Sequence, residues 1–551
     1  MKMKARTRPN PTDGDCEGAM DRRSFLKGTA GLVGGGIAAN SLGCGRRPVD
    51  VRETGRMNLL MVVIEDCSPQ TLGCYGAPLV KTPHLDAFAR TAVRFDRAYC
   101  QATVCNSSRA SFLTGLRPAA TNVYYNLDPV QRMLPPYAKT LPQLVRAKPV
   151  FSANVGKLFH SAATAGPYLD AFDRLELCDL PDGYAGIASQ RLGPSSRPRV
   201  PRFPDDDSLE RELVEIEEAW SAERGSFEKG SREWARAKNR LRQLRSEWVG
   251  DSGRSEHEEL DGRRSRLVAE LLDGFAQDQS QFFLSVGLDR PHVPLVCPKE
   301  YVSLYDPAEM PAPNAPVERD VDIPQVAKRW GRNYDIFNYL EPTPARVQKA
   351  VASYYACVSF MDAQIGVILD GLEQAGLSES TIVVVLSDHG FQLGEHGCWS
   401  KSTLFEQSTR VPLLVRIPGA SGNGEICDEL VELVDLVPTI AELWGLEPAG
   451  RGRSLTPLLS DPSRPGKQMA STVCALERVL GRSLRTKRYR YSEWRGHRHD
   501  ASVVSEAELY DLEADPWEQV NLVRDPRFDG IRSSFARILE SKGGWRRRFV
   551  G

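Results

Sequence analysis

Continuous apolar runs divide the chain into segments that predict strands buried on both faces. Each run is short and rich in apolar, often β-branched residues, as interior strands of parallel sheets are. The runs occupy residues 58–64, 282–288, 381–387 and 411–417. Two of the intervening segments, 346–375 and 433–443, carry apolar residues at helical spacing. Strands that alternate with helices predict an α/β fold, in which helices sandwich a mostly parallel sheet.

Two regions interrupt this alternation. Residues 205–249 are charged and free of proline, and their apolar residues recur three and four apart. This pattern predicts an inserted hairpin of two helices with a coiled-coil-like seam. Residues 461–551 contain short strand-like pieces such as 488–494, which predict a smaller C-terminal α+β subdomain. The main domain is therefore expected over residues 57–460.

The first 44 residues do not fit either domain. Arg22-Arg23 precedes a weakly apolar run, 28–39, which is too short and too rich in glycine to span a bilayer. A twin arginine before such a run resembles a twin-arginine export signal, and the alternative is a disordered basic tail. Leu42-Gly43-Cys44 resembles a lipoprotein cleavage site, which would anchor the chain by a lipid at Cys44. We expect an exported protein without a membrane span, in the periplasm or on the surface of a bacterial cell.

Composition narrows the choice of partners. The chain has 551 residues, of which 41% are hydrophobic and 26% charged, and its formal net charge is −1. This balance is typical of a soluble globular protein and gives no general attraction to nucleic acid or to a membrane surface. The 12 cysteines form no C-x-x-C pair of zinc-site spacing, so most are expected to be small core residues. Any anion must therefore be recognised by a few well-placed cations.

Polar residues follow three of the predicted strands directly. Glu65-Asp66 follows the first, Asp289 to His292 follow the second, and Asp388-His389 follows the third. Ligands of parallel sheets bind just beyond the carboxyl ends of the strands. A single aspartate there is more often a turn former, but three such groups would converge. Their oxygen-rich ligand set suits a hard divalent cation.

A fourth candidate element begins at Cys105. Ser107 or Ser108 is expected to open a helix that ends near Thr114-Gly115. Cys105 would then lie at the positive end of that helix, with Arg109 one turn further on. Both features stabilise negative charge on the sulfur or on an oxygen that replaces it. The alternative is a buried core cysteine.

These motifs resemble those of the formylglycine-dependent sulfatases. Residues 105–118 are similar to the sulfatase signature, C-x-P-S-R followed by a spacer and T-G. Other segments resemble the iduronate-2-sulfatase-type branch, and the similarity runs from residue 57 to 522 except for the charged hairpin. The segments are Gly73–Gly76, Thr82–Asp86, Gly156–His160, Arg290–Pro294, Ser387–Lys401 and Leu509–Leu522.

The resemblance implies an alkaline-phosphatase-like fold and a sulfuric ester hydrolase that removes sulfate from a sulfated carbohydrate. Cys105 would be oxidised to formylglycine by a formylglycine-generating enzyme, and one hydroxyl of the hydrated aldehyde would attack sulfur. The second hydroxyl would later lose its proton as the aldehyde re-forms and sulfate leaves. One Ca²⁺ beside this residue would stabilise the oxygens of the transition state. The residues implied to hold it are Glu65, Asp66, Asp388 and His389, with Cys105.

The resemblance also implies roles for five further side chains. Lys157 and Arg109 would steady the hydrated aldehyde, and His160 would act as the base in its collapse. Lys401 and His292 would bind sulfate and assist the leaving oxygen. Because Lys157 and His160 are three residues apart, we expect them on one helical turn, facing the same way.

Three positions depart from the family pattern. Ser107 stands where the signature has proline, and Glu65 stands where an aspartate is usual. The extra methylene of Glu65 would move its carboxylate by about 1.5 Å, which Ca²⁺ tolerates better than Mg²⁺. Asp289 occupies a place where the branch often has histidine. We interpret the chain as a divergent but active enzyme.

Two other functions remain open from the sequence. A phosphatase or phosphodiesterase of the same superfamily would use a threonine or serine nucleophile and two transition metals held by more histidines. Of the eight histidines only His389 stands in an obvious metal position, which weighs against this alternative. The other is a non-catalytic protein that binds sulfated glycans with Cys105 unmodified.

Overall fold

The computed structural model describes residues 54–176, 249–328, 336–337, 342–476, 479–496 and 506–541. The predicted signal at residues 1–44 and nearly all of the predicted hairpin at 205–249 lie outside these ranges, so both stay predictions. The exact domain boundaries at residues 57, 460 and 461 also stay predictions.

A nine-stranded sheet forms the centre of the described chain. Its hydrogen-bonded order is β11-β2-β12-β8-β1-β6-β3-β4, and β13 pairs in addition with β2. The strands are β1 (Asn58–Ile64), β2 (Val93–Tyr99), β3 (Phe151–Gly156), β4 (Arg174–Glu176), β6 (Phe282–Leu288), β8 (Thr381–Ser387), β11 (Arg410–Val411), β12 (Leu413–Arg416) and β13 (Ile426–Glu432). Every residue of β1, β6 and β8 is buried, as their continuous apolar runs predicted. These three strands and β3 and β4 run parallel.

The expectation of a buried parallel strand at 411–417 is wrong in two respects. The segment forms two short strands, β11 and β12, separated by Pro412, which has no N–H to donate to a sheet. Both strands pair antiparallel with β2, and β12 also pairs antiparallel with β8. The apolar run predicts the burial of this segment correctly, but it carries no information about strand direction.

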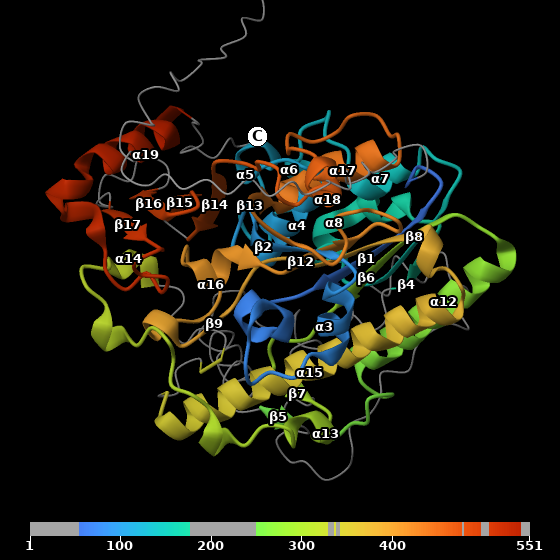
Figure 1. Cartoon of the computed structure of the whole chain (residues 1–551), viewed down its shortest axis with the longest axis horizontal. Helices are drawn as coiled ribbons and strands as arrows, with labels where there is room; N and C mark the ends of the chain where they lie inside the picture. The colour runs from blue at the N-terminus through green and yellow to red at the C-terminus, as the bar shows by residue number, and fades with distance from the viewer. Residues whose placement is uncertain are drawn as a thin grey trace, which may run out of the picture. The chain divides into compact units, whose positions relative to one another are not determined.

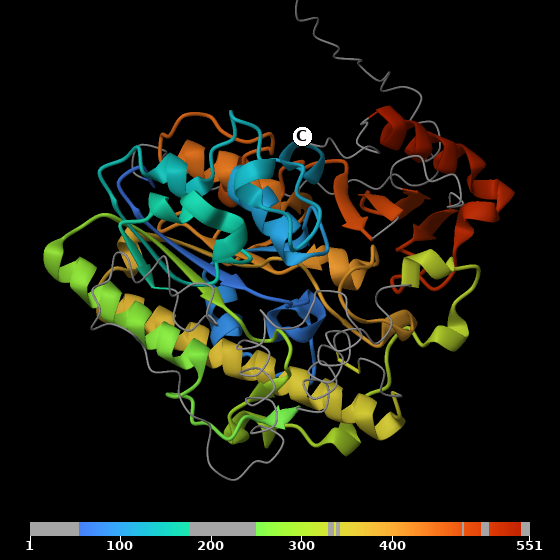
Figure 2. The same cartoon turned by 180° about the vertical axis from the view of Figure 1, so that it is seen from behind.

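Helices cover both faces of the sheet (Figures 1 and 2). On one face lie α3 (Pro83–Ala89), α12 (Leu260–Asp278) and α15 (Pro344–Gln374). On the other lie α4 (Cys105–Thr114), α7 (Leu141–Val145), α17 (Leu436–Leu443) and α18 (Thr456–Ser460). Alternate residues of β1 point to opposite faces, so Leu60 joins the first cluster and Leu59 the second. The sandwich expected from the sequence is therefore present.

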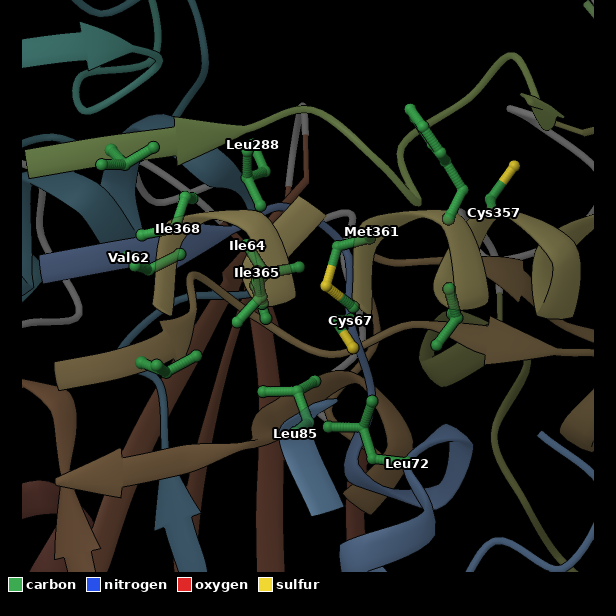
Figure 3. Close-up of a cluster of buried hydrophobic side chains, with 14 of the residues drawn as sticks. Val62, Ile64, Cys67, Leu72, Leu85, Leu288, Cys357, Met361, Ile365 and Ile368 are labelled. Carbon is green, nitrogen blue, oxygen red and sulfur yellow. The ribbon is translucent and has the colours of Figure 1, made fainter. Parts of the chain in front are cut away.

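The helix α15 is the longest of the described elements and packs directly on the sheet. Figure 3 shows its residues Met361, Ile365 and Ile368 beside Val62 and Ile64 of β1. Among the described residues it is the one helix long and apolar enough to cross a membrane, but 83% of its most apolar window is buried inside the protein. It is therefore a core helix of this domain.

The C-terminal region contains a second sheet. Its four antiparallel strands are β14 (Ala470–Ala475), β15 (Val479–Arg485), β16 (Tyr489–Gly496) and β17 (Glu506–Asp511). Helix α19 (Asp529–Ser541) packs against it through Phe535 and Leu539 (Figure 1). The strand expected at 488–494 is confirmed as β16, which begins one residue later and ends two residues later.

Shorter elements connect these parts. They are α5 (Pro118–Thr121), α6 (Val130–Met133), α8 (Ala162–Ala165), α13 (Lys299–Val302), α14 (Gln325–Lys328), α16 (Glu406–Thr409), β5 (Gly250–Asp251), β7 (Val296–Cys297), β9 (Gln392–Leu393) and β10 (Trp399–Ser400). Residues 433–435 form a 3₁₀ turn that runs into α17, so the helix expected over 433–443 is present with a tightened first turn.

Candidate active site

The carboxyl ends of β1 and β8 bring two acidic segments together. Ile64 pairs with Ser387, so Glu65-Asp66 and Asp388-His389 leave the sheet side by side. The Asp66 N–H donates to Asp388 Oδ1 at 3.3 Å, and all four side chains are buried. Asp66 has a positive φ of 60°, which turns the chain sharply at the end of β1. Two of the three strand ends predicted to converge therefore meet here, and His292, after the third, β6, has its Nε2 3.8 Å from Asp66 Oδ2.

Cys105 is the first residue of α4, with Val104 as the N-cap and no side-chain capping bond. The expectation that Ser107 or Ser108 opens the helix is wrong, because both hydroxyls are used elsewhere. Ser107 donates to the Val123 carbonyl at 2.6 Å, and Ser108 donates to the Asp388 carbonyl. Starting at Cys105 places its sulfur at the positive end of the helix, as the sequence predicted.

Two cationic or imidazole groups contact the Cys105 sulfur. His389 Nε2 lies 3.2 Å from Sγ, and Lys401 Nζ lies 3.6 Å from it. Lys401 also donates to both Asp66 oxygens at 2.7 Å. The Cys105 side chain is fully buried among these groups. Cys105 is therefore not an ordinary core cysteine, because its neighbours are charged rather than apolar.

The buried carboxylates of Glu65, Asp66 and Asp388 each have a cationic partner, which for Asp66 is Lys401. Arg109 Nε donates to Asp388 Oδ2 at 3.0 Å, and Lys157 contacts Glu65. Burial alone would raise the pKa of Glu65 and of Asp388. The neighbouring cations, Lys157 for Glu65 and His389 with Arg109 for Asp388, outweigh burial and hold both pKa values below their usual range. Glu65 and Asp388 are therefore ionised and available as ligands near neutral pH.

The donor set fits a divalent cation beside Cys105. Ligand atoms of Asp66, Cys105 and His389 lie within 4.8 Å of one another, and so do those of Glu65, Cys105 and His160. His389 Nδ1 lies 3.0 Å from the Gly390 carbonyl and must be the donor there, so Nε2 holds the lone pair of the neutral ring. Without an ion, Asp388 and Cys105 raise the pKa of His389 to about 9 against the effect of burial. A cation between Asp66 and His389 would take the place of that proton.

Lys157 and His160 lie in a bend that follows β3, and the helical turn expected for them is wrong. Gly156 precedes Lys157 with a φ of +76°, which turns the chain out of the strand instead of into a helix. Both residues nevertheless line the same pocket. Burial and Lys157 lower the pKa of His160 to about 3, so this imidazole is neutral, and a weak base in this environment.

That pocket, of about 310 Å³, opens beside Glu65 and also contains His292. His292 Nε2 lies 3.8 Å from Asp66 Oδ2 and 4.0 Å from Glu65 Oε1. Its Nδ1 lies 2.7 Å from the Val293 carbonyl, which fixes the ring with Nε2 toward the site. Every side chain singled out from the sequence thus lies around Cys105 or in the adjoining pocket.

Sequence reasoning missed three supporting residues. Tyr354 of α15 donates its hydroxyl to the Asp66 carbonyl at 2.6 Å. Ser387 accepts from the Cys67 N–H and donates to the His389 carbonyl. Asp261 of α12 accepts from the Asp289 and Arg290 N–H groups. Ser387 is the first residue of a recognised motif, but Tyr354 and Asp261 lie in helical segments whose sequence shows no sign of these contacts.

A model of the sulfatase family matches residues 57–446, well over half of the chain. The chain belongs to the sulfatase family. A second model, described as the C-terminal part of N-sulphoglucosamine sulphohydrolase, matches residues 394–543. This sulfatase is 28% identical to human iduronate 2-sulfatase, over 86% of the chain and 92% of the relative. The predicted resemblance to that branch is confirmed, and the chain is an enzyme that hydrolyses sulfate esters.

Solved structures establish the fold of this sulfatase. A phosphonate monoester hydrolase of Agrobacterium radiobacter superposes with a TM-score of 0.66 at 21% identity, covering 88% of this chain and 95% of that one. A structure in complex with its substrate D-glucosamine-2-N,6-O-disulfate superposes with a TM-score of 0.63 at 19% identity, covering 89% and 98%. The alkaline-phosphatase-like α/β fold, with a mostly parallel sheet and a C-terminal antiparallel sheet, is confirmed.

Proposed function

We propose that this sulfatase removes sulfate from a sulfated carbohydrate, using formylglycine made from Cys105 and one Ca²⁺. The observation that carries the proposal is the position of the Cys105 sulfur, 3.2 Å from His389 and 3.6 Å from Lys401 at the start of α4. The carbohydrate is supported by two similarities, one to an iduronate 2-sulfatase and one to a protein solved with a disulfated glucosamine. The substrates in these two names are those of the related proteins. That the enzyme described here acts on a sugar is part of the proposal.

The residues that would hold the cation are Glu65, Asp66, Asp388 and His389. When bound, the cation supplies positive charge for the sulfate oxygens, and the modified residue supplies the attacking oxygen. Arg109 keeps Asp388 ionised and oriented through its 3.0 Å bond. Lys401 bonds Asp66 and lies 3.6 Å from Sγ, so it can also reach a sulfate oxygen above residue 105. Hydrogen bonds from buried cations are stronger than those in water, which favours an anionic substrate here.

The residues that line the pocket would accept and donate protons during the reaction, including the proton that the leaving oxygen receives. His160 is neutral, as a proton acceptor must be, and Lys157 contacts Glu65 beside it. His292 presents Nε2 toward the site and is partly exposed to the pocket, so in its doubly protonated form it would donate to the leaving oxygen. Position and charge support these proposed roles of His160 and His292.

Conversion of Cys105 would require a formylglycine-generating enzyme as a partner. The Cys105 side chain is fully buried, so this partner would act on the chain before the domain closes around α4. Ser107, in place of the signature proline, is a small residue that leaves room for such recognition. The predicted signal at residues 1–44 supports export of the enzyme to the periplasm or to the cell surface. A lipid at Cys44 would anchor the exported enzyme to the membrane.

The decisive experiment is mass spectrometry of the Cys105 peptide together with activity on an aryl sulfate and an aryl phosphate. We expect a peptide of lower mass than the thiol form, hydrolysis of the sulfate in preference to the phosphate, and loss of both after chelation with recovery on adding Ca²⁺. Cys105→Ala should be inactive, and Cys474→Ala, at a buried cysteine of β14, should keep activity. An intact thiol with no turnover would support a sulfated-glycan-binding protein, and preference for the phosphate would support a phosphatase.

A further inference from the structure

The pocket beside Cys105 carries one carboxylate that has no part in holding the cation. This is Asp289, the first residue after β6, which lines the pocket together with Glu65, Lys157 and His292. Its side chain is 31% exposed, whereas that of Glu65 is 1% exposed. Asp289 therefore faces the space in which the part of the substrate beyond the sulfate would lie.

The backbone of Asp289 is fixed from below by α12. Asp261, near the start of that helix, accepts from the Asp289 N–H with both oxygens, at 2.9 and 3.0 Å, and from the Arg290 N–H at 2.8 Å. Because Asp261 is buried, these charge-assisted bonds hold the strand end rigidly. The carboxylate of Asp289 is thus presented to the pocket from a fixed backbone.

Arg264 of α12 keeps this carboxylate in place. Its Nη1 lies 2.9 Å from Asp261 Oδ1 and 3.1 Å from Asp289 Oδ1, and its side chain is 2% exposed. Burial would raise the pKa of Asp289, but Arg264 and Lys157 outweigh it and lower that pKa. Asp289 is therefore an ionised acceptor that pairs with Arg264, itself part of the pocket wall, while its own side chain stays 31% exposed.

We propose that Asp289 selects the substrate class. Its carboxylate accepts hydrogen bonds from hydroxyl or ammonium groups on the sugar that carries the sulfate, and it repels sugars with a ring carboxylate at that position. The contact with Arg264 uses one of the acceptor positions of this half-buried carboxylate. A substrate without a matching donor leaves the other positions unpaired, and such acceptors discriminate strongly. The enzyme accordingly acts on neutral hexose or hexosamine sulfates in preference to uronate sulfates. This inference rests on the proposed function of the same site.

The test measures binding separately from turnover. Equilibrium binding of a neutral hexose sulfate, a hexosamine sulfate and a uronic acid sulfate is determined by calorimetry in a Cys105→Ala background, with and without Asp289→Asn. We expect Asp289→Asn to weaken binding of the first two by about tenfold or more and to strengthen binding of the uronate sulfate. Equal affinities in the two proteins, uronate preference with Asp289 present, or binding of none of the three sugars would overturn the proposal.

Turnover gives a second readout in the otherwise unchanged enzyme. Asp289→Asn should raise KM for the neutral hexose sulfate, while kcat/KM for an aryl sulfate without ring hydroxyls stays within about threefold. An equal fall on both substrates would mean a structural role and would also overturn the proposal. Asp273→Asn, at an exposed position of α12, is the matched control, and melting temperatures verify that each variant is folded. Failure of the proposed function can be distinguished from failure of this inference. In the first case the unsubstituted enzyme would hydrolyse no sulfate ester, and the binding measurements would still decide the role of Asp289.

Discussion

Among single residues, Lys401 has contacts that a neutral side chain of similar size cannot reproduce. Its ammonium donates to both oxygens of Asp66 and lies 3.6 Å from the Cys105 sulfur. A sulfate oxygen above residue 105 would be a third acceptor for the same group. We expect Lys401→Gln to lower kcat by about two orders of magnitude or more, because a charge that faces the developing negative charge is removed.

Steady-state kinetics on an aryl sulfate would measure this effect. Lys487→Gln, at a half-exposed lysine that bonds Glu429, provides the control and should leave kcat unchanged. Circular dichroism and metal content should be compared in parallel, since Lys401 also pairs with a metal-site carboxylate. Retention of more than about a third of the kcat in a folded, metal-loaded Lys401→Gln enzyme would argue against its role at the sulfate.

Ser107 illustrates how a departure from the family signature fits its surroundings. The hydroxyl is fully buried and donates to the Val123 carbonyl at 2.6 Å, a bond that proline could not make. Removing it in Ser107→Ala leaves a buried carbonyl without this donor. The expected loss in free energy of unfolding is about 1 kcal/mol, measured by urea denaturation.

The same variant separates folding from modification. Activity per mole of formylglycine should not change in Ser107→Ala, because the hydroxyl points away from Cys105 to Val123. Ser533→Ala, at an exposed position of α19, is the control for the stability measurement. A Ser107→Ala protein as stable as the unsubstituted one would show that the bond to Val123 contributes nothing.

At the scale of elements, the contact between β3 and β6 determines where Lys157 lies. Gly156 and Gly287 are paired across the two strands, and a Cβ on Gly287 would overlap the backbone of Lys157. Gly287→Ala should therefore push the Lys157 bend away from Glu65. We expect a loss of about 1–3 kcal/mol in stability and a fall in kcat of up to about a hundredfold.

A glycine on the neighbouring helix makes a matched control. Gly274 of α12 has no atoms within 4 Å of the position that a Cβ would occupy. Gly274→Ala should leave activity unchanged and stabilise the protein slightly, as expected for alanine in a helix. The melting temperature should fall in Gly287→Ala and rise slightly in Gly274→Ala, and kcat should fall in Gly287→Ala alone. Similar behaviour of the two variants would contradict the steric argument at Gly287.

Much of this architecture was predictable from sequence because the signals are strong and local. The runs at 58–64, 282–288 and 381–387 have the exact bounds of β1, β6 and β8, since a fully buried strand needs an unbroken apolar run. Their acidic ends then had to meet at one edge of the sheet. The site was predictable to the same extent, because its ligands follow those strands directly.

The failures concern features that the surroundings decide. The direction of β12 depends on which neighbours it meets, and these lie far away in sequence. The start of α4 at Cys105 instead of Ser107 depends on the Val123 and Asp388 carbonyls, which capture the two serine hydroxyls. The three-residue spacing of Lys157 and His160 fits a helix, but Gly156 and its contact with β6 impose a bend. Patterns in one segment cannot report such contacts.

At the scale of the whole molecule, buried ion pairs join the main domain to the C-terminal sheet. Glu406 of α16 bonds Arg485 of β15 at 3.1 Å and also contacts Arg490 of β16. Arg490 in turn lies against Glu518, and all these side chains are nearly buried. Since removing one member would leave a buried charge unpaired, the second sheet is fixed to the first by electrostatics as well as by packing.

Glu508 of β17 is an exception in this region, because no lysine or arginine among the described residues bonds to it. Its oxygens accept from Trp494 Nε1 at 2.6 Å and from the Tyr510 hydroxyl at 2.7 Å. Burial raises its pKa to about 7, from a value of 4.5 in the unfolded chain. Between these two values the unfolded chain releases a proton that the folded protein retains, so stability falls as pH rises through the window. The slope from this group approaches about 1.4 kcal/mol per pH unit.

Glu508→Gln removes that proton while keeping an oxygen that can accept from Trp494 or Tyr510. We therefore compare the free energy of unfolding of this variant with that of the unsubstituted enzyme. The difference, variant minus unsubstituted enzyme, should increase between about pH 5 and about pH 7 and stay constant at higher pH. Urea denaturation at several pH values would measure the difference, in which all other titrating groups cancel. Glu513→Gln, at an exposed glutamate after β17, should show no such pH-dependent difference. A constant difference for Glu508→Gln across the window would mean that Glu508 is ionised in the fold, and that an unseen donor or cation compensates its burial.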